Sequence, residues 1–282
     1  MKNYKEFIAS FVPFNVELIS GAFWELDIAG INELDNSIII FALEDSPVSI
    51  ADVESILEAF KGENLIESYS VSEEVIENRN WNEEWEKKVR VIEVTDRLVI
   101  KPSFKEYNPR EEQIIIGIDP KMSFGTGEHQ TTKLVLQFLE KYTEQGARVL
   151  DVGCGTGVLA IGAVLLGAQK AIGIDNDEWC LLNGNENVAL NSLEEKVEIR
   201  LCETKDVAEK DFDLILANIN KHILIEIRDD LYGKMKTGGT LILSGLLTSD
   251  EEDIVSSYSG KGLKLIEKKN QDEWIALVFR KD

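Results

Sequence analysis

The chain has 282 residues, with 52 aspartates and glutamates against 30 lysines and arginines, a formal net charge of −22. So acidic a surface repels a phosphate backbone and attracts basic partners, which argues against direct nucleic-acid binding. Cys154, Cys180 and Cys202 lack metal-ligand spacing, the N-terminus lacks a signal-peptide core, and no apolar run could span a membrane, so we expect a cytoplasmic, soluble protein with no membrane association.

Residues 1–75 predict a small α+β domain. Strand patterns at 4–12, 37–44 and 65–73 alternate with helical patterns at 16–30 and 49–62, and GINEL adds a short strand. The resulting order, β-α-β-β-α-β, is typical of a ferredoxin-like fold. No group of catalytic side chains is visible in this part of the sequence.

The acidic stretch at 76–88 predicts a helical linker. Trp81 and Trp85 are four residues apart and would share one face of its helix. Because large aromatic side chains mostly serve burial, we favour packing between domains over contact with a ligand.

Residues 89–282 predict a second, larger domain in which strands and helices alternate. Helical patterns at 131–143, 178–191, 222–236 and 250–259 separate apolar strands, which indicates a parallel sheet. The last two strands, LKLIEKK and EWIALVFRK, have no helix between them and predict an antiparallel hairpin. The fold class is therefore α/β, a Rossmann-like domain with a mostly parallel seven-stranded sheet and an antiparallel terminal hairpin.

The segment VLDVGCGTGVLAI predicts a nucleotide-binding turn. An apolar strand carries Asp151, Gly153, Gly155 and Gly157 follow at alternate positions, and a helical pattern begins. The next strand ends at Asp175, 20 residues after Gly155, where a carboxylate can accept both hydroxyls of a ribose. The alternative is a tight turn without a ligand.

The spacing of the glycines favours a particular nucleotide. Gly157 comes one residue earlier than the third glycine of a dinucleotide motif, and Val158 occupies that motif's position. The D-x-G-x-G-x-G pattern with a distal acid resembles motifs I and II of the class I S-adenosylmethionine-dependent methyltransferases. The resemblance implies S-adenosylmethionine as the cofactor.

Two further motifs narrow the resemblance. DPKMSFGTGEHQTT precedes the helix at 131–143, where Thr131 and Thr132 offer hydroxyls that could also serve only as helix caps. FDLILANI places Asn218 at the end of a buried strand, where asparagine is also an ordinary turn residue. Together, FGTG-x-H-x-TT and A-N-I resemble the PrmA-type methyltransferases of ribosomal protein L11.

This resemblance implies the site and the partner. The family's cofactor contacts fall on Thr132, Gly153, Asp175 and Asn218, whereas no catalytic residue is assigned. It implies repeated methylation of lysine side chains and the N-terminal amine of L11, a basic substrate met before ribosome assembly, with the N-terminal domain gripping it. We expect a monomer, and no metal site, because His129 and His222 are the only histidines and lack companion ligands.

Three alternatives remain open from the sequence. The same catalytic fold could act on another protein or on a small molecule. The chain could instead be a regulator that binds S-adenosylmethionine without catalysis. An NAD-dependent oxidoreductase is disfavoured by Val158 and by the lack of a suitable catalytic set.

Overall fold

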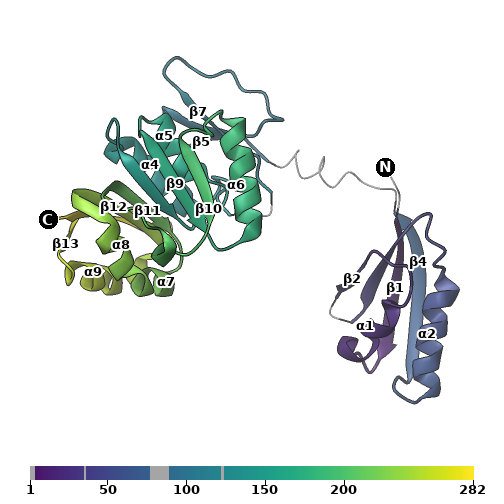
Figure 1. The fold of residues 1–282 in the computed structure, drawn as a ribbon. Helices are drawn as coiled ribbons and strands as arrows, with labels where there is room; N and C mark the ends of the chain where they lie inside the picture. The colour runs from purple at the N-terminus through teal and green to yellow at the C-terminus, as the bar shows by residue number, and fades with distance from the viewer. Residues whose placement is uncertain (1–3, 35, 77–88, 122–123) are drawn as a thin grey trace. The chain divides into compact units, whose positions relative to one another are not determined.

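The computed structural model describes residues 4–34, 36–76, 89–121 and 124–282. The chain divides into two compact units, Met1–Lys88 and Val89–Asp282 (Figure 1). The linker predicted at 76–88, with its two tryptophans, lies outside the described residues from position 77 onward. None of the helices in the described ranges is long and apolar enough to cross a bilayer.

The N-terminal unit contains a four-stranded antiparallel sheet with the ferredoxin-like order β2-β3-β1-β4. Its elements are β1 (Tyr4–Val12), α1 (Val16–Phe23), β2 (Gly30–Glu33), β3 (Ile38–Leu43), α2 (Ile50–Gly62) and β4 (Ser68–Ile76). Alternate residues of β1 and β3, such as Phe7 and Ile40, are buried with Phe23 of α1 and Leu57 of α2. The core of this unit therefore lies on one face of the sheet.

Helix α1 is shorter than its sequence pattern predicts, because it ends at Phe23 instead of Gly30. The Leu26 N–H bonds to the Phe23 carbonyl (3.1 Å) in a tight turn. The Ala29 N–H then donates to the Phe41 carbonyl (2.6 Å) of β3. Pairing with β3 thus prevents residues 24–30 from continuing the helix, although their apolar spacing is compatible with one.

The C-terminal unit contains the predicted seven-stranded sheet, in the order β10-β9-β8-β11-β12-β14-β13. Its strands are β8 (Arg148–Val152), β9 (Lys170–Asp175), β10 (Val197–Leu201), β11 (Phe212–Asn218), β12 (Met235–Leu247), β13 (Leu263–Gln271) and β14 (Trp274–Lys281). Strands β8 to β12 are parallel, and β14 is antiparallel to both neighbours. The terminal hairpin is confirmed, with β14 inserted beside β12 and β13 left at the edge.

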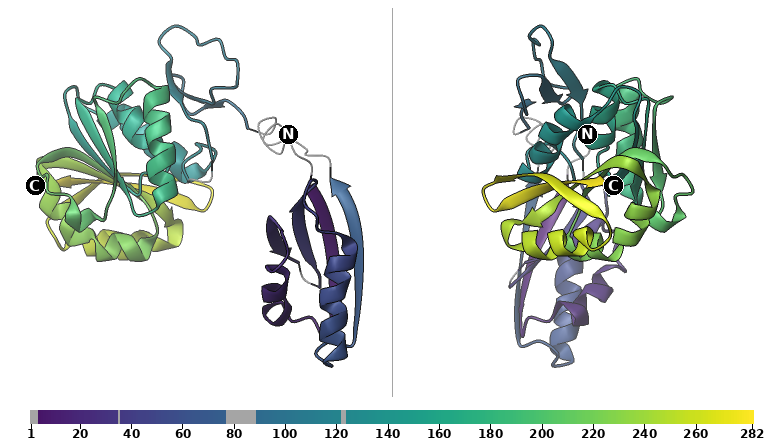
Figure 2. Two further views of the ribbon diagram at one scale, coloured as in Figure 1. Left: turned by 45° about the vertical axis from the view of Figure 1, so that its right-hand side comes forward. Right: turned by 90° about the vertical axis from the view of Figure 1, so that its left-hand side faces the viewer.

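Helices cover both faces of this sheet (Figure 2). One face packs against α4 (Gln130–Tyr142), α5 (Val158–Leu165) and α6 (Glu178–Leu190), and the other against α7 (Lys221–Glu226), α8 (Arg228–Lys234) and α9 (Glu251–Ser259). The single helix predicted at 222–236 is two helices that meet at Ile227, which leaves the α conformation (φ −85°, ψ 3°) while packing against the core.

Short elements complete the unit. A separate three-stranded sheet precedes α4, and single 3₁₀ turns follow β10 and β12. These elements are β5 (Ile92–Glu93), β6 (Leu98–Lys101), β7 (Ile114–Gly117), η1 (Thr204–Asp206) and η2 (Thr248–Asp250). Strand β7 leads directly into the glycine-containing loop before α4.

Candidate functional site

The carboxyl ends of the parallel strands meet at one edge of the large sheet. Strand β8 leads into Gly153, β9 ends at Asp175 and β11 ends at Asn218. Open parallel sheets bind ligands at this edge, where the strand order reverses. A cavity of about 460 Å³ opens here, with walls that include Gly153, Asp175, Thr204, Ile219 and Glu226.

The glycine turn between β8 and α5 requires glycine for conformation and for space. Gly153, Gly155 and Gly157 have φ values of 71°, 51° and 79°, in the left-handed region that side chains disfavour. A Cβ on Gly153 would lie 2.3 Å from Ile219 Cγ2, and one on Gly155 would lie 2.2 Å from the Phe124 carbonyl oxygen. The turn therefore keeps its backbone open toward the cavity.

Asp175 joins this turn to the end of β9. Its Oδ2 accepts the Gly155 N–H (3.0 Å), and its Oδ1 accepts the Asp177 N–H (3.2 Å). The side chain is half-buried and lines the cavity. The carboxylate oxygens held in this way retain lone pairs for vicinal hydroxyls, as a ribose would offer.

Asp151 lies beneath the turn and is completely buried. Its Oδ2 accepts the Ala160 N–H (3.2 Å) at the start of α5, and its Oδ1 has no protein partner. Burial raises the pKa of Asp151 to about 7, the Ala160 hydrogen bond opposes this, and the Asp175 carboxylate adds to it. A group that ionises near neutral pH thus lies directly behind the glycine turn.

The raised pKa of Asp151 predicts that stability falls as pH rises. The folded protein retains the Asp151 proton up to about pH 7, whereas an unfolded aspartate loses it near 3.8, so the free energy of unfolding decreases between these values. The matched variant is Asp151→Asn, which keeps an acceptor for the Ala160 N–H. Between pH 5 and 8, we expect the free energy of unfolding of wild type to fall by about 2–3 kcal/mol more than that of this variant. Urea unfolding at both pH values measures this difference, and parallel pH profiles would contradict it.

The loop before α4 closes over the glycine turn through Thr156. The Thr156 N–H donates to the Phe124 carbonyl (2.9 Å), and its hydroxyl donates to the Gly125 carbonyl (2.7 Å). Thr156 is completely buried, so these bonds are shielded from water. The FGTG segment and the glycine turn are therefore one hydrogen-bonded structure.

Asparagines on α6 and at its C-cap hold the end of β7 and the start of this loop. Asn187 Oδ1 accepts the Asp119 N–H (2.9 Å), and its Nδ2 donates to the Thr156 carbonyl (2.9 Å). Asn191 pairs with both backbone groups of Gly117 (2.8 and 2.7 Å). Sequence reasoning missed these residues, although asparagine at every fourth position of NGNENVALN was a visible signal.

Thr132 and Asn218 do not line the cavity, in contrast to Gly153 and Asp175. Thr132 is 1% exposed and Asn218 is 9% exposed. Thr132 Oγ1 and Asn218 Oδ1 are nevertheless buried without a hydrogen-bond partner. Such atoms are costly unless a ligand or water satisfies them.

His129, and not a threonine, caps α4. Its Nδ1 accepts the Thr131 N–H (3.3 Å), so the capping role considered for Thr131 and Thr132 belongs to the preceding histidine. The His129 ring packs edge-on between Phe124 (5.4 Å) and Trp274 (4.7 Å). In the part of the chain that the structure describes, no three His, Cys, Asp or Glu residues group as metal ligands.

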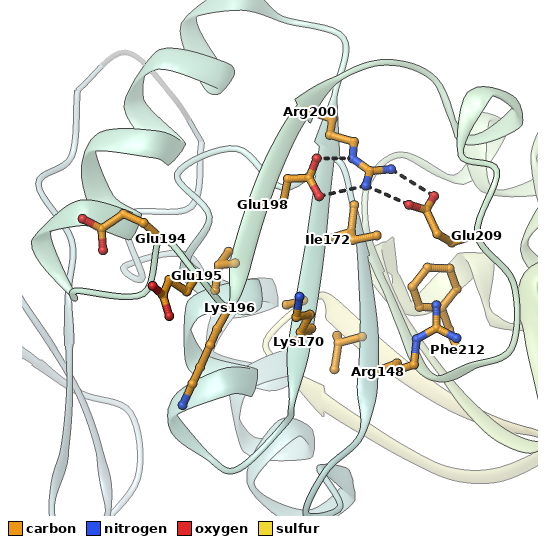
Figure 3. Close-up of a pocket in the computed structure, with 13 residues that line it drawn as sticks. Arg148, Lys170, Ile172, Glu194, Glu195, Lys196, Glu198, Arg200, Glu209 and Phe212 are labelled. Atoms are coloured by element: carbon orange, nitrogen blue, oxygen red, sulfur yellow. Dashed lines mark hydrogen bonds and ion pairs between the residues drawn. The ribbon is translucent and has the colours of Figure 1, made fainter.

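A second cavity, of about 350 Å³, lies at the amino ends of β8, β9 and β10 (Figure 3). On its wall, the Arg200 guanidinium donates to Glu198 and to Glu209 (both 2.8 Å). Arg200 is thus already paired with two carboxylates, and the cavity is at the opposite edge of the sheet from Gly153 and Asp175. We therefore assign the candidate site to the first cavity.

The residues at the carboxyl edge fit a nucleoside with a charged tail. The glycine turn leaves room for close approach, and Asp175 offers carboxylate oxygens to a diol. Thr132 Oγ1 and Asn218 Oδ1 are buried without hydrogen-bond partners. Glu203 pairs with Lys205 at the cavity wall (2.6 Å), and Glu226 and Asp230 add further carboxylates, so the net negative charge of the lining favours a cationic ligand or substrate.

Comparison with known proteins identifies relatives along most of the chain. A family model described as "Ribosomal protein L11 methyltransferase (PrmA)" matches residues 21–282. Proteins named ribosomal protein L11 methyltransferase are 34% identical in Brevibacillus brevis, over 86% of this chain and 80% of the relative, and 33% identical in Desulfotalea psychrophila, over 100% and 99%. The crystal structure of a ribosomal protein L11 methylase from Lactobacillus delbrueckii subsp. bulgaricus is 32% identical and covers 68% of this chain and 99% of that one, with a TM-score of 0.64.

Proposed function

The chain belongs to the ribosomal protein L11 methyltransferase family, and from that premise we propose that methyl donor and acceptor amine meet at the cavity beside Gly153 and Asp175. It is an S-adenosylmethionine-dependent methyltransferase of ribosomal protein L11. The observation that carries the proposed site is the hydrogen bond between Asp175 and the glycine turn at the wall of one cavity.

Four residues are proposed to hold the cofactor. Gly153 lets it approach the backbone, and Asp175 accepts hydrogen bonds from its ribose. Thr132 Oγ1 and Asn218 Oδ1, both buried without partners, would be satisfied by polar groups of the bound ligands. The assignment of Thr132 and Asn218 is supported by these two oxygens without partners and by the matching family motifs.

The proposed chemistry is alignment of a neutral amine with an activated methyl group. S-adenosylmethionine supplies a methyl group on a positively charged sulfur, so the protein chiefly has to orient the amine. Deprotonating a lysine at pH 7.5 costs about 4 kcal/mol, and burial of its stem against Ile219 and Ile223 lowers that cost. We further propose that Asn218 Oδ1, which is buried without a hydrogen-bond partner, accepts a hydrogen from the amine. We propose lysine side chains and the N-terminal amine as acceptors, methylated repeatedly.

The finer statements about partners are also proposals. We propose that the N-terminal unit recognises L11 before ribosome assembly, that the enzyme is a cytoplasmic monomer, and that it does not bind nucleic acid directly. The net charge of −22 supports a protein partner over a nucleic acid, because it attracts a basic protein and repels RNA.

Replacing Asp175 tests the ribose assignment. In Asp175→Ala we expect the affinity for S-adenosylhomocysteine to fall about 10- to 150-fold, because a charged acceptor is worth about 1.5–3 kcal/mol. Calorimetry measures the affinity. The control is Asp177→Ala, which removes a neighbouring carboxylate that caps α6 by accepting the Trp179 N–H. Unchanged affinity in Asp175→Ala, or comparable binding of NAD by wild type, would refute the assignment.

A further inference from the structure

The sheet of the N-terminal unit has a second face, opposite the one that packs against α1 and α2. Side chains alternate along a strand, so the neighbours of buried Phe7 and Ile40 point to this second face. They include Ile8 of β1, paired with Ile39 of β3, and Phe41 and Leu43 farther along β3. All four are half-buried. A sheet face meant only for solvent would carry polar residues here, so this apolar stripe indicates a contact surface.

Two carboxylates border the stripe. Glu6 of β1 is the cross-strand partner of Phe41 on one side and of Glu74 in β4 on the other. Burial and then the Glu74 carboxylate raise the pKa of Glu6. Neither glutamate forms an ion pair with a lysine or arginine among residues 4–34, 36–76, 89–121 and 124–282. Like charges directly opposite in a sheet are destabilising, and a cation between them would relieve the repulsion.

The negative charge of the N-terminal unit also favours a basic protein as the partner. Residues 1–76 contain 15 aspartates and glutamates against 3 lysines, a net charge of −12 in about a quarter of the chain. A basic protein is therefore attracted to this unit in particular, and the apolar stripe supplies area for desolvated contact.

We propose that this acidic–apolar face, formed by Ile8, Ile39, Phe41 and Leu43 with Glu6 and Glu74, is where ribosomal protein L11 docks. A lysine or arginine of L11 lies between the two carboxylates, and an apolar side chain of L11 packs on the stripe. The inference rests on the proposed function, because it assumes that the N-terminal unit recognises L11.

The test is a charge reversal at Glu74, which is exposed and outside the cofactor site. In full-length Glu74→Lys, the new ammonium occupies the place of the L11 cation and pairs with Glu6. We expect KM for L11 to rise at least tenfold, with kcat at saturating L11 and affinity for S-adenosylhomocysteine unchanged. The melting temperature should stay equal or rise, because a repulsion is removed. A residue with only a structural role would lower it.

Two further variants control the experiment. Glu54→Lys makes the same charge change on the exposed side of α2, away from the proposed face, and should change KM less than threefold. Phe41→Ser tests the stripe, and we expect it also to raise KM without changing cofactor affinity. Higher ionic strength should raise KM of wild type more than that of Glu74→Lys.

Failure of the docking face and failure of the proposed function give different results. If wild type transfers no methyl group to L11, the proposed function fails. If wild type is active but Glu74→Lys keeps the wild-type KM, or Glu54→Lys raises KM equally, the docking face is overturned and the proposed function stands.

Discussion

Gly153→Val is expected to abolish binding of S-adenosylmethionine while the protein remains folded. Its Cβ would lie 2.3 Å from Ile219 Cγ2 at the cavity wall, and the backbone φ of 71° disfavours a β-branched residue. The displaced Ile219 and the added methyl groups would occupy space next to Asp175. Calorimetry should therefore detect no binding at ligand concentrations that saturate wild type.

Gly146→Val separates obstruction from backbone strain. Gly146 has a similar φ of 79°, but a Cβ added there would meet no other atom within 4 Å, and the residue precedes β8 at the far end from the cavity. Both variants should lose stability, by about 1–2 kcal/mol from strain alone. Only Gly153→Val should lose the ligand, and wild-type affinity in that variant would show that the turn is purely structural.

Removing the N-terminal unit is expected to eliminate methylation of L11 almost completely. A shortened chain that begins at Asn78 retains all of Val89–Asp282, which has its own core and the complete cavity. Its affinity for S-adenosylhomocysteine should therefore be close to that of the full chain. L11 methylation should fall at least a hundredfold at low L11, because the tether that raises the local concentration of target amines is gone.

Kinetics with the shortened chain distinguish recognition from catalysis. Raising the L11 concentration should recover part of the rate, because the catalytic unit is intact. The isolated N-terminal unit, added separately, should not restore it. Methylation of L11 by the shortened chain at the full-length rate would contradict the proposed role of the N-terminal unit.

The elements that position the cofactor site could be predicted from the sequence because their signals are local. Glycines at 153, 155 and 157 follow a strand and precede a helix, and each has the positive φ that only glycine adopts easily. Asp175 ends the next strand, and parallel neighbours bring strand ends to one edge. The alternation of strands and helices predicts the parallel sheet and its antiparallel terminal hairpin, whereas the strand order, with β14 between β12 and β13, comes from the structure alone.

Other features depend on contacts between distant residues and could not be predicted. Asn187 bonds Asp119 and Thr156, which are 68 and 31 residues away. The burial of Asp151, and with it the raised pKa, follows from packing around it. Helix α1 ends early because Ala29 pairs with Phe41 of β3, a tertiary effect that overrides periodicity.

The most direct test of the account is mass spectrometry of purified L11 after incubation with the full-length protein and isotopically labelled S-adenosylmethionine. We predict labelled methyl groups on lysine side chains and on the N-terminal amine, with labelling strongly reduced in Asp175→Ala and absent in Gly153→Val. Wild-type protein that binds S-adenosylmethionine at the cavity but leaves every amine of L11 unlabelled would contradict the account.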